Sequence, residues 1–137
     1  MRKNQTKEEE RAARRREAAA KGVHTRRTNA MNKKMNAILE TMPEDQRFIA
    51  KELADNFVFL SVRITELREA LLKQPSVISY DNGGGQTGFR ENPNISVYNK
   101  LVTRHADLCM KLAKLLPEAA DDAKDELEAF IGSVSYT

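Results

Sequence analysis

The stretch at residues 80–93, with the sequence YDNGGGQTGFRENP, constrains the fold most, because it holds four of the six glycines in the chain. Glycine adopts positive φ at little cost, so three consecutive glycines at 83–85 end any helix that reaches them. The preceding residues 77–80 have the composition of a short strand, and Asn82-Gly83 is a favoured turn. We therefore expect a glycine-rich loop or a small β-hairpin at 75–93, connecting two helical segments.

Both segments that flank the glycines have the apolar spacing of long helices. Pro75 should end the first, and Asn92-Pro93 supplies a cap and a first-turn proline for the second. The spacing predicts an antiparallel helical hairpin over about 44–73 and 95–116. Its apolar stripe is wider than one partner helix would cover, so we expect a neighbouring subunit to pack there. The residues expected to form the core and the oligomerisation surface are Leu53, Phe57, Leu60, Ile64, Leu67, Leu101, Leu108 and Leu112.

The remaining segments complete an all-α prediction. Thr28 or Asn29 can cap a short helix that ends at a tight corner containing Pro43. An acidic, amphipathic helix should follow Pro117, with a polar face that is either solvated or docked on a basic partner. We expect one helical oligomerisation domain over 28–137, preceded by a mobile arm over 1–27.

The N-terminal segment is strongly basic. Residues 1–34 hold twelve Lys and Arg against four Glu, whereas the remainder of the chain is net acidic. A helix is expected from Thr6 to just before Gly22, and it lacks large apolar side chains beyond Met1. Clustered cations of this kind favour a polyanion such as DNA, although they also suit a solvated tail. The candidate DNA-binding residues are Arg11, Arg14, Arg15, Arg16, Lys21, Arg26, Arg27, Lys33 and Lys34, with Arg90 on the glycine-rich tip.

The sequence shows no pattern typical of a catalytic, metal or cofactor site. His105 lies in the apolar seam, which favours a neutral core histidine over a metal ligand or general base. The glycines are followed by Phe89-Arg90 and not by the Lys-Ser/Thr of a phosphate-binding loop. A single cysteine, Cys109, fits a reducing cytosol. We expect no enzyme activity, no cofactor or metal, and no membrane span or signal peptide.

Residues 35–117 resemble the small subunit of a tailed-phage terminase. The resemblance is carried by the glycine-rich stretch 80–93, by Val97-Tyr98-Asn99-Lys100-Leu101 after it, and by the ending Leu112 to Pro117. The corner Lys114-Leu115-Leu116-Pro117 departs from the family pattern, which often has Gly and Thr there. The basic arm lies outside the resemblance.

The resemblance implies a non-enzymatic DNA-packaging protein in the host cell cytoplasm. Such a protein binds double-stranded viral DNA near the packaging start and delivers it to a large subunit that hydrolyses ATP and cuts DNA. It also implies a homo-oligomer, commonly a ring. The alternatives are a dimeric helical DNA-binding transcriptional regulator, with a helix-turn-helix assembled between subunits, and a structural adaptor whose arm only aids solubility.

Overall fold

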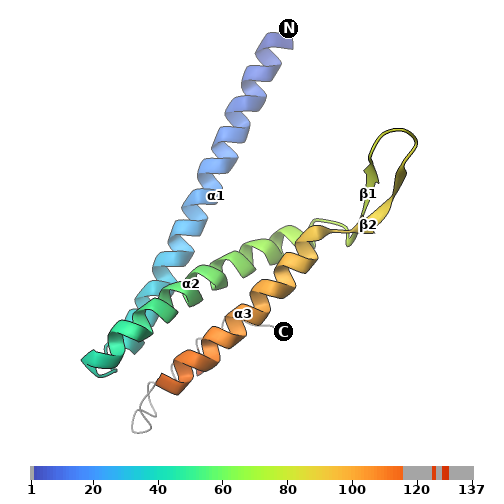
Figure 1. Ribbon diagram of the computed structural model, residues 1–137. Coiled ribbons are helices and arrows are strands. Elements are labelled where there is room, and N and C mark those ends of the chain that lie inside the picture. Colours follow the sequence, from blue (N-terminus) through green and yellow to red (C-terminus); the bar gives the residue numbers. More distant parts are fainter. Residues whose placement is uncertain (1, 116–124, 126–127, 130–137) are drawn as a thin grey trace.

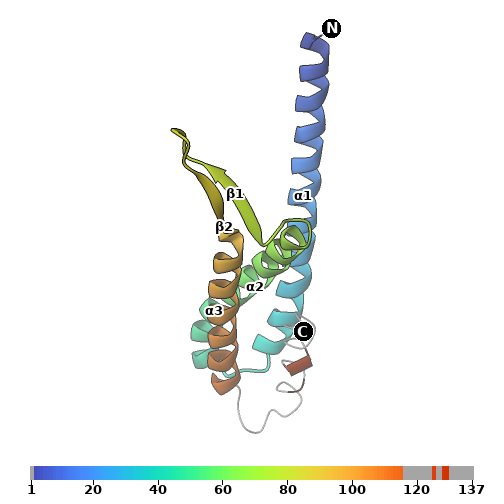
Figure 2. The same ribbon diagram turned by 90° about the vertical axis from the view of Figure 1, so that its right-hand side faces the viewer.

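The chain folds into three helices and one small antiparallel sheet, as the computed structural model shows (Figure 1). The structure describes residues 2–115, 125, 128 and 129. The elements in chain order are α1 (Arg2–Leu39), α2 (Glu44–Leu72), β1 (Val77–Asp81), β2 (Thr87–Glu91) and α3 (Pro93–Leu115). Helices α2 and α3 lie side by side and antiparallel, while α1 packs on α2 near its C-terminal end and projects from the body with its N-terminal end (Figures 1 and 2). The predicted helical hairpin is therefore present.

Helix α1 is continuous, whereas the sequence predicted two helices separated near Gly22. A lone glycine costs about 1 kcal/mol relative to alanine and does not by itself stop a helix. The hydroxyl of Thr25 donates a 2.9 Å hydrogen bond to the carbonyl oxygen of Lys21, and Lys21 forms an ion pair with Glu17. Thr28 is a half-buried residue inside the helix and not a cap.

The corner between α1 and α2 is where the sequence placed it. Pro43 precedes the first turn of α2, and its carbonyl oxygen accepts hydrogen bonds from the backbone N–H groups of Gln46 and Arg47. The guanidinium of Arg47 also donates 2.9 Å to the carbonyl oxygen of Met42. These bonds satisfy backbone groups that a helix terminus leaves free, so the chain reverses direction within four residues.

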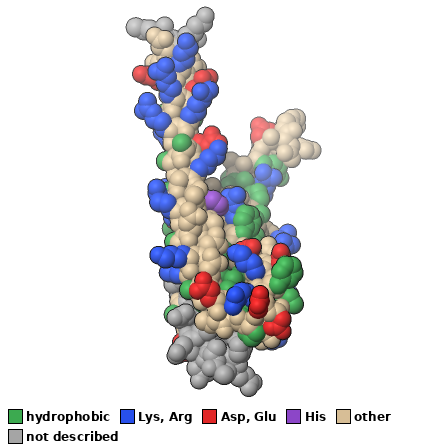
Figure 3. All heavy atoms as spheres, turned by 90° about the vertical axis from the view of Figure 1, so that its left-hand side faces the viewer, with side chains coloured by type: hydrophobic (Ala, Val, Ile, Leu, Met, Phe, Trp, Pro, Cys, Tyr) green, Lys and Arg blue, Asp and Glu red, His purple; other side chains and the backbone are tan. Residues whose placement is uncertain are grey.

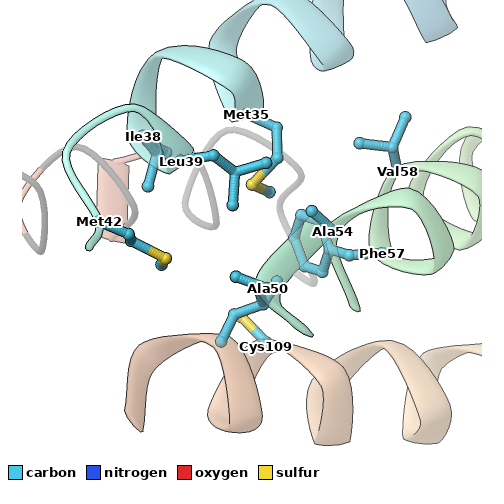
Figure 4. Close-up of a cluster of buried hydrophobic side chains, with 10 residues drawn as sticks. Met35, Ile38, Leu39, Met42, Ala50, Ala54, Phe57, Val58 and Cys109 are labelled. Carbon is cyan, nitrogen blue, oxygen red and sulfur yellow. The ribbon is translucent and has the colours of Figure 1, made fainter. Parts of the chain in front are cut away.

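The core lies where α1 and α3 both pack against α2. Alanines at positions 50 and 54 of α2 are fully buried, and their small side chains let the neighbouring helices approach closely. Figure 4 shows side chains of α1 and the corner directed at α2, with Cys109 of α3 beside Ala50. The cluster comprises Met35, Ile38, Leu39, Met42, Ala50, Ala54, Phe57, Val58, Cys109 and Leu112.

The face of α2 that is buried differs from the predicted seam. Phe57 and Ile64 of that seam are buried, but Ile49 is 57% exposed, and Leu53, Leu60, Leu67 and Leu71 are only half-buried. The prediction assumed one partner helix. Because α1 and α3 both contact α2, the buried face rotates toward Ala50, Ala54, Val58 and Ser61, and the leucines lie at its margin.

His105 is buried between α2 and α3. Its Nε2 atom shares a hydrogen bond with the Ser61 hydroxyl, and its ring stacks on Phe57 with centroids 4.3 Å apart. Burial lowers the pKa of His105 to about 4, so the ring is neutral at pH 7. This core histidine matches the interpretation favoured from the sequence.

The glycine-rich stretch forms a β-hairpin. Gly83, Gly84 and Gly85 all have positive φ, and the Gly83 N–H donates 2.8 Å to the Asp81 carboxylate. At the base, buried Asn92 accepts a 3.1 Å hydrogen bond from the Asn94 N–H and donates to the carbonyl oxygen of Pro75. Asn92 thus caps α3 and ties it to the end of α2. The predicted acidic helix after Pro117 lies outside the described residues except for Asp125, Glu128 and Ala129, which are helical.

We expect His105 to make the fold sensitive to mild acid. Below pH 6.5 the unfolded chain takes up a proton that the buried ring in the folded chain does not bind until the pH approaches 4. This contribution to stability is therefore complete above pH 6.5 and is lost as the pH falls to about 4. Its size is on the order of 3 kcal/mol. Urea unfolding at several pH values measures the decline.

The matched variants are His105→Gln and His24→Gln, because the chain has only these two histidines. His105→Gln should remove the decline between pH 6.5 and 4 beyond what the carboxylates contribute. His24→Gln should retain it. An equal decline in wild type and His105→Gln would contradict this assignment.

Candidate nucleic-acid interface

One face of α1 carries a stripe of exposed cations. Arg11, Arg15, Arg26 and Lys33 are separated by 4, 11 and 7 residues, which are close to whole helical turns. All four side chains are exposed. Figure 3 shows Lys and Arg side chains distributed along α1. We call these four residues the outer stripe.

The outer stripe faces away from the body. The α1 residues that contact α2 include His24, Met31, Met35 and Ile38, which are spaced by 7, 4 and 3 residues on a second face. Arg26 follows His24 by two residues, a rotation of about 200° around the helix axis. Packing of α1 on α2 therefore leaves the outer stripe open to a partner.

The other predicted cations of α1 do not join this stripe. Arg14, Arg16 and Lys34 are exposed at other angles around the helix. Lys21 lies toward α2 and pairs with Glu17. Arg27 is half-buried and its guanidinium forms an ion pair with the Glu69 carboxylate, so its charge is already matched within the chain.

Two cross-helix pairs attach α1 to α2, and sequence reasoning missed both. His24 pairs with Glu66, and Arg27 pairs with Glu69 one turn further along. The matching three-residue spacings, 24 to 27 and 66 to 69, were a readable signal, but only if α1 was already known to pack on α2. The predicted arm 1–27 therefore contacts the body near its C-terminal end.

A groove of about 800 Å³ opens beside these pairs, between α1 and α2. Its lining mixes acidic Glu17, Glu66 and Glu69 with basic Lys21, Arg63 and Lys73. Because both signs of charge alternate there, the groove has no preference for an anion. The outer stripe is the better candidate surface for phosphates.

Arg90 lies apart from the α1 cations. It is exposed on β2, where it pairs in register with Ile78. The hairpin projects from the end of the α2–α3 pair, separate from α1 (Figures 1 and 2). A single copy of the chain therefore presents Arg90 and the outer stripe as two surfaces.

Other chemistry is limited over the residues that the structure describes. Among them, no three His, Cys, Asp or Glu side chains come close enough together to hold a metal ion. Within the same residues, no helix combines the length and the apolar character needed to cross a bilayer. Burial raises the pKa of the Cys109 thiol, which favours its unreactive protonated form.

Comparisons with protein-family models, with curated proteins and with solved structures found no match to this chain.

We expect Gly22→Ala to stabilise α1 by about 0.5–1 kcal/mol, because alanine has the higher helix propensity. A Cβ atom at position 22 would lie 3.8 Å from the Arg26 guanidinium, an ordinary contact, so there is no steric cost. Hydrogen exchange of the α1 amides should show greater protection on both sides of position 22. Unchanged or reduced protection would contradict a continuous helix.

Gly88→Ala is the matched control with the opposite outcome. A Cβ atom there would lie 2.7 Å from the Tyr80 hydroxyl oxygen and 2.9 Å from the adjacent ring carbon. The ring of Tyr80 must then move, so exchange should rise in β1 and β2 and remain unchanged in α1.

Proposed function

We propose that this chain is a non-catalytic DNA-packaging protein of the terminase small-subunit type. It binds double-stranded viral DNA through the outer stripe of α1, assembles into a homo-oligomer through its helical body, and delivers the DNA to a large subunit in the host cytoplasm. The resemblance of residues 35–117 to that family supports the packaging role.

The observation that carries the DNA-binding part is the outer stripe. Its four cations are exposed, lie on one face, and extend from Arg11 to Lys33 over roughly 33 Å at 1.5 Å per residue. Contacts with phosphates release condensed counterions, which drives association without base reading. Several copies of α1 in one assembly would raise the affinity further, because the contacts after the first are intramolecular.

Separate parts of the chain then serve separate partners. The half-buried leucines at the margin of α2 supply apolar surface for assembly. The sequence after Pro117 carries the acidic residues Glu118, Asp121, Asp122, Asp125, Glu126 and Glu128. We assign this acidic segment to the large subunit, because its sign is opposite to that of the DNA-binding end.

The test is the salt dependence of duplex binding. Replacing Arg11, Arg15 and Arg26 together by Gln should weaken binding and reduce the slope of log affinity against log salt by about 0.9 for each phosphate that is no longer neutralised. Fluorescence anisotropy with a labelled duplex of arbitrary sequence measures both quantities. Because phosphate contacts carry no sequence information, the weakening should be similar for unrelated duplexes.

A control with the same change in net charge is Lys51, Lys100 and Lys114 replaced together by Gln. These lysines are exposed on α2 and α3. The control should keep most of the slope. Equal weakening in both variants would show that only net charge matters and would remove the DNA-binding role from the outer stripe.

A further inference from the structure

Two surfaces of the chain remain without a role, and they complement each other. The first is one face of the β-hairpin. Side chains alternate along a strand, so one face carries Val77, Ser79 and Asp81 of β1 together with Thr87, Phe89 and Glu91 of β2. We call it the outer hairpin face. The opposite face carries Ile78, Tyr80, Gly88 and Arg90, and Tyr80 packs there against Gly88.

The outer hairpin face is apolar and acidic. Phe89 is 79% exposed and Val77 is also exposed, and their positions in register are diagonal neighbours. Asp81 and Glu91 are the charged residues on this face, and both are acidic. A projecting two-stranded hairpin is marginally stable in water by itself. Its exposed phenylalanine therefore has a reason to be covered by a partner.

The second surface is a row of leucines along the α2–α3 pair. Ser61 contacts His105, and Arg68 contacts Tyr98, which fixes the antiparallel register of the two helices. Along each helix, leucines recur every seven residues and come level with those of the other helix to within one turn. The leucine row consists of Leu53, Leu60, Leu67, Leu101, Leu108 and Leu115, all half-buried.

The leucine row lies on the side of the α2–α3 pair that α1 does not cover. Val58 and Cys109 mark the opposite side, because both belong to the core cluster with the α1 methionines. Arg104 and Lys111 border the row on α3, each three residues after one leucine and four before the next. Both cations are exposed. The row is therefore apolar with a basic edge.

We propose that the outer hairpin face of one copy docks on the leucine row of the next copy. Phe89 and Val77 would cover leucines, while Asp81 and Glu91 would approach Arg104 and Lys111. The hairpin projects away from its own helices, so a neighbouring chain is the partner that it can reach (Figures 1 and 2). The inference deepens the proposed function, on which it rests for the expectation of an oligomer.

The charges disfavour two other occupants. Pairing two leucine rows face to face would bring four cations together, which is repulsive. Docking of the outer hairpin face on DNA would place Asp81 and Glu91 against phosphates. The proposed contact joins two different surfaces of the same chain, so repetition leads to a ring if the rotation closes and to a filament if it does not.

Phe89→Ser is the first test, with Phe48→Ser as the matched control. The two phenylalanines are equally exposed, at 79% and 78%, but Phe48 lies outside both surfaces. Sedimentation velocity should show that Phe89→Ser weakens self-association at least about tenfold. Phe48→Ser should assemble like wild type. Unchanged assembly of Phe89→Ser would overturn the proposal.

Mixing two variants tests the head-to-tail geometry. Phe89→Ser disables the outer hairpin face and Leu60→Glu disables the leucine row, so each should be monomeric alone. Mixed together they retain one intact pair of surfaces and should form a one-to-one heterodimer that grows no further. Lys111→Glu, a substitution at an exposed position, replaces Leu60→Glu if circular dichroism shows that the latter is unfolded. A mixture that stays monomeric would overturn the proposal.

Failure of this contact can be told apart from failure of the proposed function. Anisotropy on the same samples measures duplex binding. A wild-type chain that assembles through Phe89 without binding DNA would retain the contact and remove the packaging role. A chain that binds duplex with a salt slope set by α1 but assembles independently of Phe89 would retain DNA binding and remove the contact.

Discussion

The close packing of two helices on α2 is the constraint on which the rest of the structure depends. Ala50 and Ala54 are buried, and their small side chains make room for α1 on one side and α3 on the other. This packing directs the inner face of α1 toward the body, so the outer stripe of cations faces outward. It also turns the leucines of α2 toward the margin, where they remain half-buried. Both candidate surfaces thus follow from the same packing.

Much of the architecture could be predicted from local sequence. The glycines at 83–85, Pro43 and Asn92-Pro93 each act through backbone geometry that depends on a few residues, so the hairpin, the corner and the start of α3 lie where expected. The continuity of α1 could not be predicted, because its middle is held by pairs with Glu66 and Glu69, 42 residues away in sequence. Likewise, heptad spacing identified the apolar residues of α2 but could not show that two helices would share them.

The candidate site was predictable as a charge cluster but not as a surface. Counting cations in residues 1–34 treats Arg26 and Arg27 alike, whereas the packing of α1 exposes Arg26 and pairs Arg27 with Glu69. The leucine row is a similar case. Its residues were expected to pack within the hairpin and between subunits, and only their partial burial separates these roles. We therefore assign DNA to the outer stripe and neighbouring copies to the leucine row.

The most direct test of this assignment is native mass spectrometry of the full chain, with and without a short DNA duplex. We predict an assembly of more than two copies that takes up the duplex intact and releases it at raised salt. A monomer, or a dimer that takes up no DNA, would contradict it.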